Sequence, residues 1–99
     1  MTTHKTQNRE VYATVKVLID AGHAKTFSSI FPTVKKTNFA KDMGMNYQTL
    51  LYRIKHLGSF TVDEINAAAY LVGVDKRVIF GMIATEIESK RQKPTIKSK

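Results

Sequence analysis

Apolar residues recur every three or four positions along most of this chain, which is the spacing of one face of an α-helix. Over residues 8–21 the recurring apolar positions are Val11, Val15, Leu18 and Ile19. The valines alone also fit a strand, but the whole set fits a helix better, and Gly22 supplies a stop. A shorter helix is expected over residues 25–31. It should end there because Pro32 disfavours helix in the residue before it.

Two short helices are predicted next, over residues 35–43 and 47–56, with a turn at Gly44 between them. Asn46 is a favourable N-cap for the second of these helices. The positions expected to face the core are Phe39, Ala40, Met43, Leu50, Ile54 and Leu57.

The last two helices have clear start signals. Thr61 and Glu64 have the spacing of a capping box, which predicts a helix that runs to about residue 72 and stops at Gly73. Asp75 is placed to cap a final helix, whose apolar stripe is Val78, Ile79, Met82, Ile83 and Ile87. The polar, basic residues 90–99, interrupted by a proline, are predicted to be a disordered tail.

The pattern predicts an all-α fold: a compact bundle of five to six helices in one domain. We divide it into an N-terminal extension with one long and one short helix (1–34), a core (35–89) and the basic tail (90–99). The 42% of apolar residues is enough for a folded core. Without cysteine, a signal peptide or a membrane-spanning run, a cytoplasmic protein is expected.

The net charge of +8 is unevenly distributed. Residues 35–56 hold five basic residues against one acidic residue, a net charge of +4, and residues 90–99 hold five basic residues and no acidic one. Nucleic acid is the polyanion that such a pattern favours. An anionic membrane is a weaker candidate, because the basic residues do not follow one face of a long amphipathic helix.

The short helices around Gly44 meet the requirements of a helix-turn-helix. Ala40 is small enough for two helices to cross closely, Gly44 tolerates the left-handed turn, and Leu50 begins the buried face of the second helix. The remaining side chains of that second helix are rich in hydrogen-bonding groups. Many helical hairpins share this spacing, but together with the cap at Asn46, the net charge of +4 and the polar outer side of the second helix it predicts that residues 35–56 form a DNA-binding helix-turn-helix.

Two segments, "NFAKDMGMNYQTLLYRI" and "FTVDEINAAAYLVGVDKRVIFGMI", resemble the helix-turn-helix domain of the Cro/C1-type (XRE-like) phage repressor family. The resemblance covers residues 35–83 and implies a sequence-specific DNA-binding regulator of transcription, often dimeric. It places Tyr47, Gln48 and Tyr52 among the base-reading side chains, and Lys36 where family members contact the DNA backbone. The chain departs from the family at Arg53, where an apolar residue is common.

The chemistry of the side chains agrees with those assignments. Gln48 can pair with adenine and Arg53 with guanine, while Thr49 and the tyrosine rings can contact a thymine methyl group. Three residues suit phosphates: Lys36, Asn46 and Lys55. Several of these residues have an ordinary alternative: Tyr47 packed on the protein surface, Gln48 as an exposed helix residue, Tyr52 on a neighbouring helix, Arg53 in a surface salt bridge, and Lys55 solvated.

Catalysis has little support in the sequence. The three histidines are far apart and lack metal-ligand spacing, and no Gly-rich phosphate loop follows a strand. No enzyme activity, metal, cofactor or small-molecule ligand is therefore expected. The expected partners are double-stranded DNA and a second copy of the chain, paired through the first or the last helix. A protein-interaction module that no longer binds DNA, and an RNA-binding protein that uses the tail, remain alternatives.

Overall fold

The order of helices along the chain follows the apolar pattern of the sequence. The computed structural model describes the backbone of residues 2–98 and the side chains of residues 9–91. Within residues 2–98 it has no strand, and its elements are α1 (Thr2–Asp20), the 3-10 helix η1 (Phe27–Ile30), α2 (Lys36–Met43), α3 (Tyr47–Lys55), the 3-10 helix η2 (Leu57–Ser59), α4 (Val62–Val72) and α5 (Lys76–Ser98). The predicted all-α fold is confirmed. None of the helices in this part of the chain is long and apolar enough to cross a membrane.

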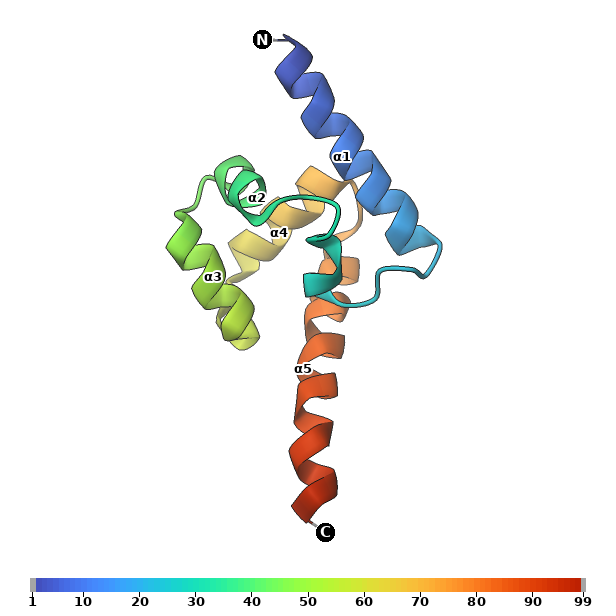
Figure 1. Cartoon of the computed structure of the whole chain (residues 1–99), viewed down its shortest axis with the longest axis vertical. Coiled ribbons are helices and arrows are strands. Elements are labelled where there is room, and N and C mark those ends of the chain that lie inside the picture. The colour runs from blue at the N-terminus through green and yellow to red at the C-terminus, as the bar shows by residue number, and fades with distance from the viewer. Residues whose placement is uncertain (1, 99) are drawn as a thin grey trace.

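Helix α4 lies at the centre of the arrangement and contacts α1, α2 and α5 (Figure 1). Helices α2 and α3 lie on one side of the molecule, while α1 and α5 point away from the centre in opposite directions. The molecule is therefore elongated, with extents of 56 × 30 × 22 Å. Helix α3 packs against α2, and α2 in turn packs against α4, so α2 connects α3 to the centre of the fold.

One hydrophobic core joins the N-terminal extension to the later helices. Aromatic rings at its centre meet edge to face, with ring centroids 4.9 Å apart for Phe27 and Phe60 and 6.0 Å apart for Phe27 and Phe39. Such pairs add about 0.5–1.5 kcal/mol each beyond the burial of their area. The same cluster includes Tyr12 and Val15 of α1. The extension is thus packed into the fold.

Several boundaries differ from the prediction. Helix α1 begins at Thr2, well before residue 8. Straight-chain residues such as Lys5 and Gln7 are compatible with a helix but add nothing to its apolar stripe. The segment predicted over residues 25–31 is a single 3-10 turn, and η2 was not predicted.

The disordered tail predicted for residues 90–99 is contradicted. Helix α5 continues to Ser98, and Lys99 lies outside the described residues. Lys90 and Arg91 are good helix formers, and no glycine or cap residue ends the helix at residue 89.

Two partly buried polar contacts hold the outer elements in place. The Tyr12 hydroxyl of α1 donates a hydrogen bond of 2.6 Å to the Asp42 carboxylate of α2. Burial, together with this hydrogen bond, raises the pKa of Tyr12 well above its ordinary value. The buried Glu86 carboxylate of α5 accepts hydrogen bonds from the backbone N–H and the hydroxyl of Ser28, at 2.9 and 2.7 Å. These contacts fix α1 on α2 and η1 on α5.

Candidate nucleic-acid interface

The turn between α2 and α3 is built as the sequence predicts. Gly44 has a φ of 73°, in the left-handed region where glycine carries no steric penalty. Its N–H donates to the Lys41 carbonyl at 3.0 Å, and the Met45 N–H donates to the Ala40 carbonyl at 2.9 Å. The Asn46 side chain then accepts a hydrogen bond of 2.7 Å from the Gln48 N–H and caps α3. Two neighbouring local signals therefore set where α3 begins.

Helix α3 is anchored by its inner face. Leu50 is fully buried, and Ile54 packs against the core from a half-buried position. Ala40 of α2 is 2% exposed, as expected for a small residue where two helices approach closely. Burying a leucine contributes roughly 1.5–3 kcal/mol, so Leu50 alone is a substantial anchor for a helix of nine residues.

The outer face of α3 carries exposed polar side chains. Gln48, Tyr52 and Lys55 are exposed and follow one another at intervals of four and three residues, so they lie on one side of the helix. We call these three residues the outer face of α3. Tyr47 is 40% exposed at the first turn, and Thr49 is half-buried beside the outer face. The tyrosine ring of Tyr52 contacts the His56 ring, with centroids 4.4 Å apart.

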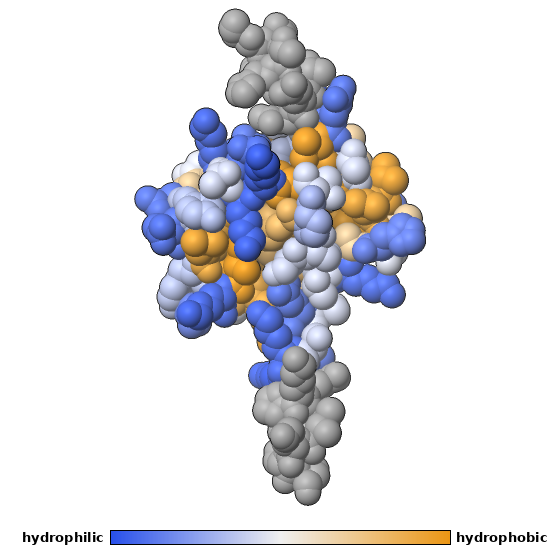
Figure 2. Space-filling view, viewed as in Figure 1, coloured by the Kyte–Doolittle hydropathy of each residue, from blue (hydrophilic) through white to orange (hydrophobic). Residues whose placement is uncertain are grey.

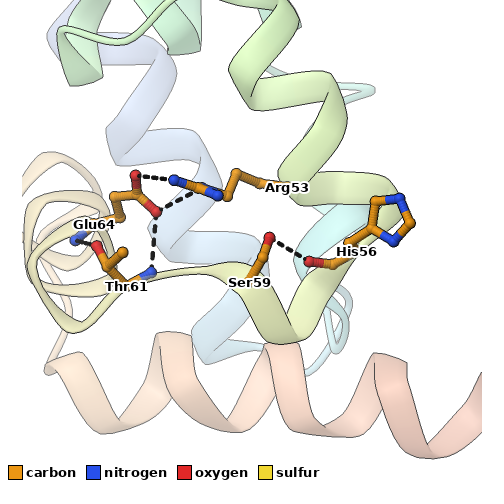
Figure 3. Close-up of polar contacts among 5 residues, drawn as sticks. All are labelled: Arg53, His56, Ser59, Thr61 and Glu64. Carbon is orange, nitrogen blue, oxygen red and sulfur yellow. Dashed lines mark hydrogen bonds and ion pairs between the residues drawn. The ribbon is translucent and has the colours of Figure 1, made fainter.

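Arg53 does not belong to the outer face. Its guanidinium makes a two-pronged ion pair with the Glu64 carboxylate at 2.9 and 3.1 Å (Figure 3). The two side chains are only 21% and 19% exposed. In this arrangement Arg53 links α3 to the start of α4. The structure therefore has Arg53 in a salt bridge, which was the alternative to a base contact in the sequence analysis.

Glu64 serves two structures at once. Besides binding Arg53, its carboxylate accepts a hydrogen bond of 3.0 Å from the Thr61 N–H, while the Glu64 N–H donates to the Thr61 hydroxyl at 3.1 Å. This is the predicted capping box. Burial acts to raise the pKa of Glu64, but the hydrogen bonds from Thr61 and Arg53 together hold that pKa below its ordinary value of 4.5. The carboxylate is therefore ionised at neutral pH and couples the start of α4 to α3.

Of the residues assigned to phosphates, Lys36 has a protein partner. Lys36 is half-buried, and its ammonium lies 5.8 Å from the centroid of the Phe31 ring in a cation–π contact. Lys55 is exposed at the last turn of α3, and Asn46 is exposed although its oxygen is used by the cap. Lys36 and Lys55 are thus held on different elements, at the start of α2 and the end of α3.

Some residues beside the interface were not anticipated. Leu51 is half-buried, and helical spacing places it next to the outer face.

Elsewhere in the fold, the hydrogen bonds of Asp42 with Tyr12 and of Glu86 with Ser28 were not predicted. Glu86 is buried and occupies a position of the α5 apolar stripe, four residues after Met82. A carboxylate at such a position is the signal that could have indicated a buried partner.

Comparison with known proteins gives no match: no family model, no curated protein and no solved structure matches this chain. Among the described residues, no group of three or more histidine, cysteine, aspartate or glutamate side chains is placed to hold a metal ion.

Proposed function

We propose that this protein binds duplex DNA sequence-specifically through α3 and regulates transcription, in the manner of a phage repressor. The observation that carries the proposal is the outer face of α3, where Gln48, Tyr52 and Lys55 are exposed together on a helix whose inner face is anchored. A helix presented in this way fits the major groove of B-DNA, about 12 Å wide. The proposed function needs no catalysis and no cofactor.

Each side chain of α3 has a chemical role in this proposal. The Gln48 amide can make a two-pronged pair with adenine, and Tyr47, Thr49 and Tyr52 can contact base edges or thymine methyl groups. The exposed N-terminal end of α3 at Asn46 suits a phosphate. Lys36 and Lys55 flank the reading residues and are suited to phosphates on either side of the groove.

Arg53 has a different role in the proposal from the one expected from the sequence. Because its guanidinium is held by Glu64, we assign it the role of positioning α3 against α4. A small displacement of a recognition helix weakens every base contact that it makes. The ion pair is therefore proposed to hold the geometry that the base contacts require.

A symmetric dimer is part of the same proposal. One short helix reads only a few base pairs, whereas two helices related by a two-fold axis read two half-sites about 34 Å apart. Exposed apolar side chains occur on α1 (Val17, 64%), α4 (Tyr70, 88%) and α5 (Phe80, 61%). The sequence pointed to the first or the last helix as the dimer interface. The exposed Tyr70 adds α4 as a third candidate.

A protein-interaction module is the second candidate function. Tyr70 is the observation that favours it, because an aromatic side chain that is 88% exposed beside an open groove lined by Tyr12, Ala13 and Leu71 is a suitable protein contact. A module of this kind would use α4 and leave the outer face of α3 without a nucleic-acid partner. DNA-binding measurements separate the two candidates.

The proposal is tested by measuring duplex binding as a function of salt. Fluorescence anisotropy on a site selected from random duplexes should give a log–log slope of roughly −4 to −6, as expected for about 4 to 7 neutralised phosphates at about 0.9 each. Asn66→Ala, which removes an exposed amide of α4, is the control and should leave binding unchanged. No binding at low salt, or an affinity independent of salt, would refute the proposed function.

A further inference from the structure

An open cleft lies between the end of α3 and α5. Its volume is about 750 Å³. Its lining residues are Lys55, His56, Leu57, Gly58 and Ser59 on one side and Ile87, Lys90 and Arg91 on the other. We call it the basic cleft. It joins two segments, 55–59 and 87–91, that are distant in the sequence.

The basic cleft concentrates positive charge. Lys55, Lys90 and Arg91 are all exposed, and the His56 ring, which points away from the Arg53–Glu64 pair in Figure 3, adds a hydrogen-bond donor or acceptor. Figure 2 shows hydrophilic side chains gathered where α5 leaves the body of the molecule. The cleft is therefore suited to a polyanion rather than to one small inorganic anion.

Among the residues whose side chains are described, Glu86 is a buried carboxylate next to the cleft, and it already has partners. Glu86 accepts two hydrogen bonds from Ser28 and forms a longer ion pair with the Lys90 ammonium, at 3.7 Å. The Lys90 side chain remains 58% exposed. Its charge is thus directed in part towards solvent, where an external anion can meet it.

Gly58 lies in an open part of the lining of the basic cleft. A Cβ atom added at this position would meet no atom within 4 Å, and its φ lies outside the left-handed region. Neither packing nor backbone conformation therefore demands glycine here. The lining also includes Leu57 and Ile87, so the C–H groups of a deoxyribose and the charge of its phosphate each find a matching part of the lining.

The cleft continues the surface proposed to read DNA. Lys55 belongs both to the outer face of α3 and to the basic cleft. It lies seven residues after Gln48, about 10 Å along the helix. Because the major groove is about 12 Å wide, a duplex that brings a base edge to Gln48 places its backbone within reach of the cleft.

From this juxtaposition we infer that the basic cleft holds the sugar–phosphate backbone of one DNA strand beside the groove that α3 enters. The inference rests on the proposed function and adds a second contact, made by α5, to the one made by α3. Phosphate contacts of this kind fix the position of a protein on the duplex without reading its sequence.

Gly58→Glu tests the inference, with Gly58→Gln as a control of the same size. The open position accommodates both side chains, and matched thermal unfolding curves establish that both variants fold. On the selected duplex, the carboxylate of Gly58→Glu should lower affinity by about tenfold or more at low salt. It should also make the salt slope less steep by about 1 to 2, as expected for one or two lost phosphate contacts. Gly58→Gln should bind nearly as the unsubstituted protein does.

Replacing single phosphates with neutral methylphosphonates locates the contact. At the phosphates held by the cleft, the replacement should weaken binding of the unsubstituted protein and of Gly58→Gln, but have little further effect on Gly58→Glu. If Gly58→Glu and Gly58→Gln bind with equal affinity and slope, the cleft is not a DNA contact and the inference is overturned while the proposed function stands. If the unsubstituted protein binds no duplex at low salt, both are overturned.

Discussion

The ion pair between Arg53 and Glu64 should contribute measurably to stability. Its side chains are 21% and 19% exposed, so it lies between an exposed pair, which contributes about 0.2–1 kcal/mol, and a fully buried pair, whose disruption costs about 3–5 kcal/mol. The geometry is two-pronged, at 2.9 and 3.1 Å, which favours the upper part of the range. We therefore expect Arg53→Ala to lower the free energy of unfolding by about 1.5–2.5 kcal/mol.

Removing the other partner should cost more. Glu64→Ala also removes one half of the capping box with Thr61, and the loss of a helix cap costs about 0.5–2 kcal/mol. The expected loss is about 2–3.5 kcal/mol, a large fraction of the 5–15 kcal/mol typical of a folded domain. Because Glu64 acts on both partners, the double variant should be more stable than the sum of the two single losses predicts.

Urea denaturation followed by far-ultraviolet circular dichroism measures these differences. The four proteins of the double-mutant cycle should give a coupling energy of about 1–2 kcal/mol. Asp20→Asn, which disrupts the exposed pair with Lys16 on α1, is the control and should change stability by less than about 0.5 kcal/mol. A coupling below about 0.3 kcal/mol, or an Arg53→Ala variant as stable as the control, would refute the assignment of Arg53 as a positioning residue.

Two further predictions concern acid and assembly. Because the folded-state pKa of Glu64 is lowered from 4.5, its contribution to stability is complete above that pH and is lost as the pH falls through the lower value. Glu64→Gln should therefore lose less stability than the unsubstituted protein between about pH 5 and about pH 3 in urea titrations, and equal losses would contradict this. Light scattering should find two protomers on a selected duplex with two-fold symmetry; a single protomer on an asymmetric site would count against the dimer.

Signals that are close together in the sequence predicted the fold well. The partners of these signals lie only a few residues away along the chain. The left-handed turn at Gly44, the N-cap at Asn46 and the Thr61–Glu64 capping box are all present as predicted. Helix α1 and the end of α5 were predicted less well, because their polar ends carry neither apolar periodicity nor a cap.

Contacts between distant residues could not be predicted from one sequence. Arg53 pairs with a residue 11 positions away, Tyr12 with one 30 away, and Glu86 with one 58 away. Helical periodicity predicted that Gln48, Tyr52 and Lys55 are exposed, but it could not show that Arg53 would turn towards Glu64. The basic cleft could not be predicted for the same reason, because its two sides come from residues 55–59 and 87–91, which are far apart in the sequence.

The most direct test of the central claim is the sequence preference of Gln48→Ala. Gln48 is exposed on α3, and its amide is the side chain best suited to pair with a base edge. The substitution should cost about 1–3 kcal/mol of binding free energy on the selected duplex and almost nothing on random duplex, whereas Lys36→Ala should weaken both about equally. A folded Gln48→Ala protein that keeps its full preference for the selected duplex would contradict the claim that the outer face of α3 reads DNA.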